Sequence, residues 1–231
     1  MNKKILIVAV VILVLGGIGA GFYFWQLKDK KIISQQNSIN LDDPNQVFNI
    51  AAPADFDANK KQRLEEKIAA AKDLYQNKKD DTWTWIVIGN MYEFVHDYDR
   101  AILAYERTLS INSSEMISLT NLGYIYEHQK NDYRKAEEYY RKAVTIYAQI
   151  VDNYLNLARL YEYKMSRLDD AEKVYLDGLK NTENNAELMV NLINFYQRQK
   201  RTNKAAEYAG QLLKLYPANQ LYQNDFGALI K

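Results

Sequence analysis

The side chains that most often carry acid–base or metal chemistry are scarce and scattered in this chain. It has two histidines, His96 and His128, which stand 32 residues apart, and it has no cysteine. A protein metal site usually needs three or four ligands close together, and no further ligand stands near either histidine at a suitable spacing. The sequence therefore predicts solvent-exposed loop histidines, no metal, no cofactor, and neither thiolate nor disulfide chemistry.

The clusters of charged residues are typical of solvated surfaces rather than of a catalytic centre. The carboxylate pairs Glu137-Glu138 and Asp169-Asp170 are expected on outer helix faces, and no glycine-rich phosphate loop or Ser-His-Asp set is present. The basic zone within residues 60–79 is interrupted by acidic residues, and the net charge of +1 provides no overall attraction to nucleic acid. These features argue against an enzyme and against a nucleic-acid-binding protein.

The elements that position the remaining residues follow a repeating pattern. Small or apolar residues recur at intervals of 34, 35 and 35, at Gly89, Gly123, Ala158 and Ile193. Three positions after these residues stand Tyr92, Tyr126, Tyr161 and Tyr196. A second small residue recurs at Ala101, Ala136, Ala171 and Ala205, and four positions later stand Tyr105, Tyr140, Tyr175 and Ala209. Spacings of three and four predict two successive helices in each copy, with the recurring residues on their packed faces.

This pattern resembles the tetratricopeptide repeat, a pair of antiparallel helices of about 34 residues. The resemblance implies an all-α fold, a right-handed α-α superhelix, with four repeats. They are expected at residues 82–115, 116–150, 151–185 and 186–219. The second and third copies carry one extra residue, near Asn131 and Arg167. The fourth copy has Ile193 where the family prefers glycine and Ala209 where it prefers an aromatic residue.

The ends of the repeat array are expected to be covered by single helices, since an unstacked repeat exposes its apolar face. The predicted solenoid spans residues 59–231. Residues 59–79 are expected to form a capping half repeat with its apolar stripe at Leu64, Ile68, Ala71 and Leu74. Residues 220–231 are expected to form a C-terminal capping helix whose Leu221 and Leu229 cover the last repeat, with Phe226 as a further candidate.

The N-terminal residues 1–31 are predicted to be a transmembrane anchor. An uncharged run of 21 residues, Ile5 to Trp25, would form a helix about 31 Å long, enough to cross a hydrocarbon core of roughly 30 Å. A cleaved signal peptide is the alternative, with a weak cleavage site at Gly17-Ile18-Gly19, but its apolar core is usually only about 7–15 residues long. Residues 32–58 show no sustained periodicity and are predicted to be a flexible tether.

The predicted topology is a single-pass protein of the bacterial cytoplasmic membrane with the repeats outside the cytoplasm. This orientation rests on resemblance to single-span anchors that export a long C-terminal domain. Lysines flank both ends of the span, so their number does not decide the orientation. The pairs Gly16 with Ala20 and Gly17 with Gly21 would let two such helices pack closely, which keeps a homodimer open as an alternative.

The resemblance also implies a binding surface, because the first helices of such repeats line a concave groove. The groove residues that it implies are Trp83, Ile86, Asn90, Phe94, Thr120, Asn121, Tyr124, Glu127, Leu155, Asn156, Arg159, Tyr163, Asn194 and Arg198. The family's carboxylate clamp requires basic residues at positions that are here occupied by Ile86, Asp152 and Asn156. A groove with aromatic and aliphatic residues suits an extended or helical peptide with apolar side chains.

The sequence thus predicts a membrane-anchored scaffold or assembly factor that binds a protein or peptide partner in the groove. It contacts the lipid bilayer through residues 5–25 and has no nucleic-acid partner. The alternative is a structural module that self-associates through the transmembrane helix and the solenoid.

Overall fold

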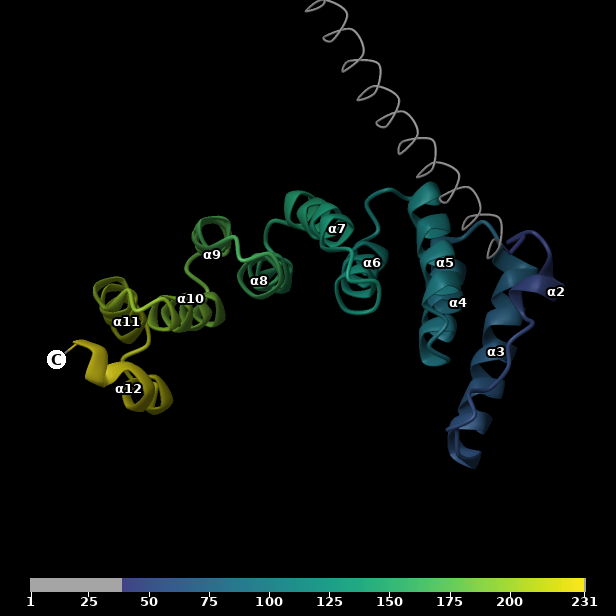
Figure 1. Ribbon diagram of the computed structural model, residues 1–231, viewed down its shortest axis with the longest axis horizontal. Helices are drawn as coiled ribbons and strands as arrows, with labels where there is room; N and C mark the ends of the chain where they lie inside the picture. The colour runs from purple at the N-terminus through teal and green to yellow at the C-terminus, as the bar shows by residue number, and fades with distance from the viewer. Residues whose placement is uncertain (1–38, 231) are drawn as a thin grey trace, which may run out of the picture. The chain divides into compact units, whose positions relative to one another are not determined.

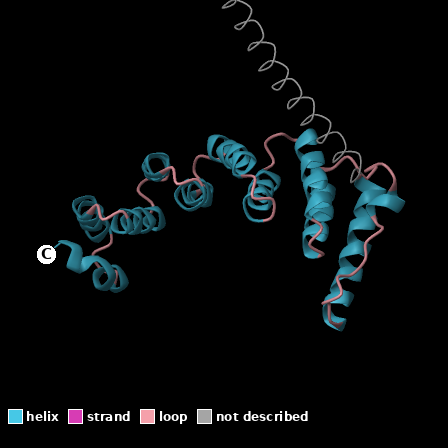
Figure 2. Cartoon of the chain, viewed as in Figure 1, coloured by secondary structure: helices cyan, strands magenta, loops and turns pink. Residues whose placement is uncertain are grey.

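The computed structural model describes residues 39–230, and all regular structure in this part of the chain is helical (Figure 1, Figure 2). This confirms the all-α expectation for these residues. The chain divides into two compact units, residues 1–51 and residues 52–231, which are described separately. The predicted anchor, residues 1–31, lies outside the described residues. Between residues 39 and 230 no helix is both long enough and apolar enough to span a membrane.

The described part of the first unit contains one turn of helix, α2 (Pro44–Val47). The side chain of Asp43 caps this helix by accepting a hydrogen bond of 2.9 Å from the backbone amide of Asn45. Gln46 donates to the same carboxylate at 3.0 Å and accepts from the backbone amide of Asn40 at 2.7 Å. The segment predicted as a tether therefore includes a short, locally hydrogen-bonded turn.

The second unit is a row of helix pairs. Its helices are α3 (Ala58–Lys78), α4 (Thr82–Phe94), α5 (Tyr98–Ile111), α6 (Met116–His128), α7 (Tyr133–Ile146), α8 (Val151–Arg159), the π-helix η1 (Leu160–Lys164), α9 (Leu168–Asn181), α10 (Ala186–Arg198), α11 (Thr202–Leu215), α12 (Gln220–Phe226) and the 3₁₀-helix η2 (Gly227–Ile230). Helix α4 packs on α5, α6 on α7, α8 on α9 and α10 on α11. Each pair falls within one predicted repeat, and the second helix of each pair also contacts the first helix of the next (Figure 1).

The turn inside each pair has the same backbone device in all four copies. The residue just before the N-cap of the second helix has a positive φ angle in every copy; these residues are His96, Asn131, Ser166 and Lys200. The backbone amide of the next residue then donates to the carbonyl of the recurring first-helix tyrosine, over distances of 2.8–2.9 Å. The left-handed residue reverses the chain, and the hydrogen bond fixes where the second helix begins.

The extra residue of the second and third copies is absorbed at the end of the first helix. In the second copy, the amide of Lys130 donates to the carbonyl of Ile125, five residues earlier. In the third copy, the five-residue spacing extends over a π-helix, η1, and the amide of Met165 donates to the carbonyl of Leu160. A π-helix accommodates an inserted residue without breaking the helix, and such bulges are frequent at functional sites.

The helices of a pair cross closely where a tyrosine ring lies on a glycine. A methyl group added at Gly89 would lie 2.5 Å from the ring of Tyr105, and one added at Gly123 would lie 2.4 Å from the ring of Tyr140. Atoms of a real side chain do not approach a ring so closely, so neither position has room for a larger residue. Both tyrosines are buried.

The fourth copy fills the same space in the opposite way. Ile193 stands at the glycine position and Ala209 at the tyrosine position, and both are fully buried. In this copy the larger side chain is on the first helix and the smaller one is on the second. The two departures from the family pattern therefore compensate each other, which agrees with the need for constant volume in a packed interior.

Half-buried carboxylates join the third copy to its neighbours. Glu137 of α7 accepts hydrogen bonds from the Tyr161 hydroxyl at 2.7 Å and from the Arg167 guanidinium at 2.9 Å. We call the contact between two successive copies a joint. Glu172 of α9 is the equivalent residue at the joint between the third and fourth copies, where Tyr196 donates to it at 2.8 Å. The expectation that Glu137 lies on a solvated outer face is therefore wrong, because its partners come from the next repeat. Glu138, the other member of this carboxylate pair, is exposed, as expected.

The two ends of the array differ in how well they are covered. Helix α3 buries Leu64, Ala71 and Tyr75, so the predicted apolar stripe is turned slightly toward Tyr75. At the other end, Phe226 is buried, but Leu221 is 63% exposed. The prediction that Leu221 covers the last repeat is wrong, because α12 has only seven residues and turns Phe226, the further candidate, inward.

We expect Gly123→Ala to destabilise the protein by about 1–3 kcal/mol, because the added methyl group overlaps the buried ring of Tyr140. Gly210→Ala is the matched control. Gly210 also lies inside a helix, but a methyl group there would meet only Ile230, at 3.8 Å. This variant should gain about 0.5–1 kcal/mol from helix propensity. Urea unfolding of the full chain in mild detergent measures both, and a stabilised Gly123→Ala variant would refute the close crossing.

The Glu172 joint predicts a pH-dependent contribution to stability. Burial raises the pKa of the Glu172 carboxyl, but hydrogen bonds from Lys204, Tyr196 and Arg201 outweigh this and lower it overall. A lowered pKa in the folded state stabilises the protein above the unfolded value of about 4.3, and this stabilisation disappears as the pH falls through the folded pKa.

We therefore expect Glu172→Gln to cost about 1–2 kcal/mol at pH 7 and progressively less as the pH falls below about 4.3. Glu138→Gln is the control, since Glu138 is exposed and pairs only with Lys142, four residues along its own helix. It should change the free energy of unfolding by less than about 0.5 kcal/mol. Urea titrations between pH 3 and pH 7 measure the difference, and a Glu172→Gln deficit that is the same at every pH would contradict this account.

Candidate functional site

A groove of the second unit lies between the first helices of the second and third copies. Its volume is about 520 Å³. It is lined by Thr120, Asn121, Tyr124, Glu127 and His128 of α6, Tyr140 of α7, Asn156 and Arg159 of α8, and Tyr163 and Lys164 of η1. Seven of these ten residues belong to the groove predicted from the sequence.

Two tyrosine rings provide the apolar surface of this groove. Tyr124 is 49% exposed and Tyr163 is 57% exposed. The ring of Tyr124 is held by the imidazole of His128, one helical turn later, with 4.5 Å between the ring centroids. The ring of Tyr163 lies against the Arg198 guanidinium, which is 5.4 Å from the ring centroid. Both rings are therefore supported from one side and open to solvent on the other.

Three asparagines at the same repeat position have different partners. The Asn121 amide donates to the Tyr105 hydroxyl at 2.9 Å. The Asn191 amide donates to a backbone carbonyl of its own helix at 2.8 Å, and its oxygen accepts from Arg159 at 3.2 Å. Asn156 is half-buried, and its side chain has no hydrogen-bond partner among residues 39–230. Of these three amides, Asn156 is the one left available in the groove.

A buried carboxylate lies beneath the groove. Glu127 accepts a hydrogen bond of 3.1 Å from the Tyr140 hydroxyl, and its carboxylate lies 3.6 Å from the His128 imidazole. Burial, and then the charge of Glu127, raise the pKa of Tyr140 well above its usual range. Tyr140 is therefore protonated at neutral pH and remains a hydrogen-bond donor to Glu127.

The same pairing of a second-helix tyrosine with a first-helix glutamate occurs in the first copy. The Tyr105 hydroxyl donates to Glu93 and to Asn90. Burial raises the pKa of Glu93, and the hydrogen bond from Tyr105 opposes that rise. The glutamates at this position are therefore components of the packed structure and not free acids.

The C-terminal edge of the groove is held by an ion pair between copies. The Arg198 guanidinium donates two hydrogen bonds to the buried carboxylate of Glu162, from Nε at 2.7 Å and from Nη2 at 2.9 Å. A bidentate arginine–carboxylate pair fixes both side chains in one geometry. Because Arg198 also lies over Tyr163, this pair helps to define where the ring of Tyr163 stands.

Several predicted groove residues lie elsewhere. Ile86 and Leu155 are 3% and 2% exposed, so they belong to the apolar core and offer no surface to a ligand. Phe94 is half-buried against Phe56, with a centroid distance of 5.2 Å, and two cations of α3 lie over its ring. Trp83 is 51% exposed at the first copy and does not line the groove of about 520 Å³.

The remaining predicted residues surround the groove without lining it. Asn90 accepts from Tyr105 at 2.6 Å, Asn194 is half-buried on α10, and Arg198 is bound to Glu162. Lys164 and Tyr140 line the groove but were not among the predicted residues. The extra residue of the third copy was the available signal for Lys164, because the π-helix that absorbs this residue includes Lys164.

His128 is exposed, as expected, but it belongs to a helix and not to a loop. It is the last residue of α6, lies on the groove, and contacts both Tyr124 and Glu127. His96 is exposed in a turn, as expected. Among the described residues, 39–230, no group of three or more metal-binding side chains is found.

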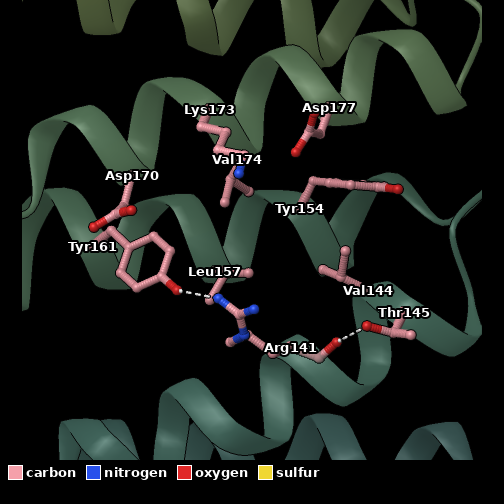
Figure 3. A pocket seen from close by; sticks show the side chains of 10 residues that line it. All are labelled: Arg141, Val144, Thr145, Tyr154, Leu157, Tyr161, Asp170, Lys173, Val174 and Asp177. Atoms are coloured by element: carbon pink, nitrogen blue, oxygen red, sulfur yellow. Dashed lines mark hydrogen bonds between the residues drawn. The ribbon is translucent and has the colours of Figure 1, made fainter.

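A second, smaller cavity of about 160 Å³ lies on the side of the second helices (Figure 3). Its walls come from α7, α8, η1 and α9. The Arg141 guanidinium points across it toward the Tyr161 hydroxyl, at 3.4 Å. Val144, Leu157 and Val174 provide its apolar part. Ligand pockets usually have volumes of about 300–1,000 Å³, so this cavity is large enough for a single side chain at most.

Comparison with known proteins supports the repeat assignment in the middle of the chain. Residues 118–150 match the family model of the tetratricopeptide repeat. This segment comprises most of α6, all of α7 and much of the groove wall. No curated protein matches the chain by sequence.

Solved structures with the same fold include proteins of low sequence identity. A crystal structure of MamA protein has a TM-score of 0.56 and 16% identity, covering 71% of this chain and 89% of that chain. A MamA fragment from Desulfovibrio magneticus RS-1 has a TM-score of 0.54 and 16% identity, covering 78% and 99%. YrrB, described as a tetratricopeptide-repeat protein with an unusual peptide-binding site, has a TM-score of 0.51 and 18% identity, covering 69% and 81%. The helix pairs thus form a tetratricopeptide-repeat-like solenoid.

Proposed function

We propose that this protein is a membrane-anchored scaffold that binds peptide segments of partner proteins in the groove between α6 and η1. One observation carries the proposal. The groove combines two half-exposed tyrosine rings with a half-buried amide, Asn156, that has no partner in the described part of the chain. Tyrosine rings provide contact area for apolar side chains, and an amide can donate to and accept from a peptide backbone.

The rigidity of the groove favours binding without rearrangement. Glu127 is held by Tyr140, and Tyr163 is held by the Arg198–Glu162 pair. Pre-positioned side chains lose little conformational entropy when a ligand binds, so more of the contact energy appears as affinity. The fold is shared with YrrB, for which a peptide-binding site is described, and this adds to the proposal.

The membrane anchor is the second part of the proposal and rests on the sequence of residues 1–31. The uncharged run from Ile5 to Trp25 is long enough to cross a bilayer. We propose that it holds the repeats outside the cytoplasm, where their groove would meet partners of the cell envelope.

The groove predicts that aromatic truncations reduce binding without unfolding the protein. We expect Tyr124→Ala and Tyr163→Ala each to weaken peptide binding by roughly 1–2 kcal/mol, since partly exposed aromatic residues often contribute strongly to an interface. Both rings are about half exposed, so the melting temperature should change little. Titration calorimetry with peptides selected on the full chain from a random 12-residue library measures the affinity.

Lys180→Gln and Lys214→Gln are the controls for these variants. Both residues are exposed on second helices and lie outside the groove. Lys135 is unsuitable because it donates to the Tyr126 hydroxyl at 3.0 Å, and Lys173 is unsuitable because it lines the smaller cavity. If the control substitutions reduce peptide binding and the tyrosine substitutions do not, the groove between α6 and η1 is not the binding site.

The topology can be tested separately. We expect the mature protein to retain residues 1–25 and to fractionate with membranes, because the apolar run lacks a good cleavage site. Protease added to intact spheroplasts should degrade the repeats. Repeats that survive until the membrane is lysed would show that the orientation is reversed. A mature N-terminus just after Gly19 or Ala20 would show that the segment is a cleaved signal peptide.

A further inference from the structure

The charges that line the groove are not balanced. Arg159 and Lys164 are exposed cations on its wall, and Lys164 forms no ion pair with any residue that the structure describes. Arg159 has one hydrogen bond, of 3.2 Å, to the neutral amide of Asn191. Glu127 is the only carboxylate among the ten lining residues, and it is buried and bound by Tyr140. The accessible charge in the groove is therefore positive.

The carboxylate of Glu162 does not cancel this charge. Glu162 precedes Tyr163 on η1, but it is buried, and the Arg198 guanidinium binds both of its oxygens. Glu127 interacts with His128 as well as with Tyr140. Arg159 and Lys164 thus lack an anionic partner within residues 39–230, and a ligand carboxylate would meet both cations close to the Tyr163 ring.

The π-helix places two of these residues. Tyr163 and Lys164 both belong to η1, which exists because the third copy has one residue more than the first and fourth. In the second copy, which has the same extra residue but no described π-helix, the position equivalent to Lys164 is Gln129, and Gln129 does not line the groove. The local backbone distortion therefore adds a cation beside an aromatic ring.

We propose that the groove selects acidic peptide segments, in which at least one Asp or Glu pairs with Arg159 and Lys164. An apolar or aromatic side chain of the segment lies on Tyr124 and Tyr163, and the backbone of the segment bonds to the Asn156 amide. This inference rests on the proposed function of the groove. It differs from the family's carboxylate clamp, since both cations stand at other repeat positions and Lys164 is contributed by the π-helix.

The first experiment selects binders from a random 12-residue peptide library on the full chain in detergent micelles. The selection is repeated on the Tyr124→Ala/Tyr163→Ala and the Arg159→Gln/Lys164→Gln variants. We expect sequences rich in Asp or Glu together with aromatic or aliphatic residues to be enriched on the unsubstituted chain. Charge complementarity and apolar contact each contribute to selection at such a surface, so both double variants should lose these sequences.

The second experiment measures the charge preference directly. A fluorescein-labelled peptide from the selection is compared, by anisotropy, with a version in which every Asp and Glu is replaced by Asn and Gln. We expect the acidic form to bind at least about tenfold more tightly at 50 mM salt, with a smaller difference at 500 mM, because salt screens exposed charges. Arg159→Gln/Lys164→Gln should remove the difference, whereas Lys180→Gln/Lys214→Gln, which removes the same total charge, should preserve it.

The outcomes separate this inference from the proposed function. If neutral or basic peptides are enriched and their binding requires Tyr124 and Tyr163, the groove binds peptides but the inference of an acidic ligand is wrong. If no sequence is enriched above the level seen with Tyr124→Ala/Tyr163→Ala, both the proposed function and the inference are wrong. Circular dichroism melts confirm that each variant is folded before its binding is interpreted.

Discussion

The packing of a tyrosine ring on a glycine is the contact on which the helix pairs depend. In the first two copies, the ring of Tyr105 or Tyr140 occupies the space that a side chain at Gly89 or Gly123 would need. The tyrosine comes from the second helix and the glycine from the first, so the contact sets how closely the two backbones approach. An aromatic side chain buries a large apolar area, and its hydroxyl must find a partner once it is buried.

That requirement links the core to the surface. The hydroxyl of Tyr140 finds its partner in Glu127, and the hydroxyl of Tyr105 finds partners in Glu93 and Asn90. Tyr140 therefore packs in the core with its ring and reaches the groove with its hydroxyl. A change to this residue would alter both the packing of the pair and the position of the carboxylate under the groove. The fourth copy has Ala209 at this position and correspondingly has Gln197 where the other copies have glutamate.

Much of this architecture follows from local periodicity and could be predicted. The helix pairs, the small residues at the crossings and the exposed tyrosines of the groove all follow the repeat of 34 or 35 residues, which is visible in the sequence itself. Other features depend on which neighbour reaches a side chain. Glu137 appears as an ordinary surface carboxylate in the sequence, but Tyr161 and Arg167 of the next copy bind it. Sequence spacing could not show this, because the partners belong to a different repeat and their directions depend on the packing.

The same dependence on neighbours explains why the groove is open between the second and third copies. Each of these joints has an asparagine at the same repeat position. At the first joint, Asn121 bonds to the Tyr105 hydroxyl, and at the last joint Arg159 and the backbone satisfy Asn191. At the middle joint, the Tyr140 hydroxyl donates to Glu127 but receives no hydrogen bond from Asn156, whose amide has no protein partner in the described chain. Because Asn156 is only half-buried, water can bond to its amide, and the backbone of a ligand peptide can replace that water. Equivalent residues in a repeat array thus acquire different roles because their neighbours' hydrogen bonds are satisfied differently, and the copy with the π-helix is the one that retains free donors beside exposed rings.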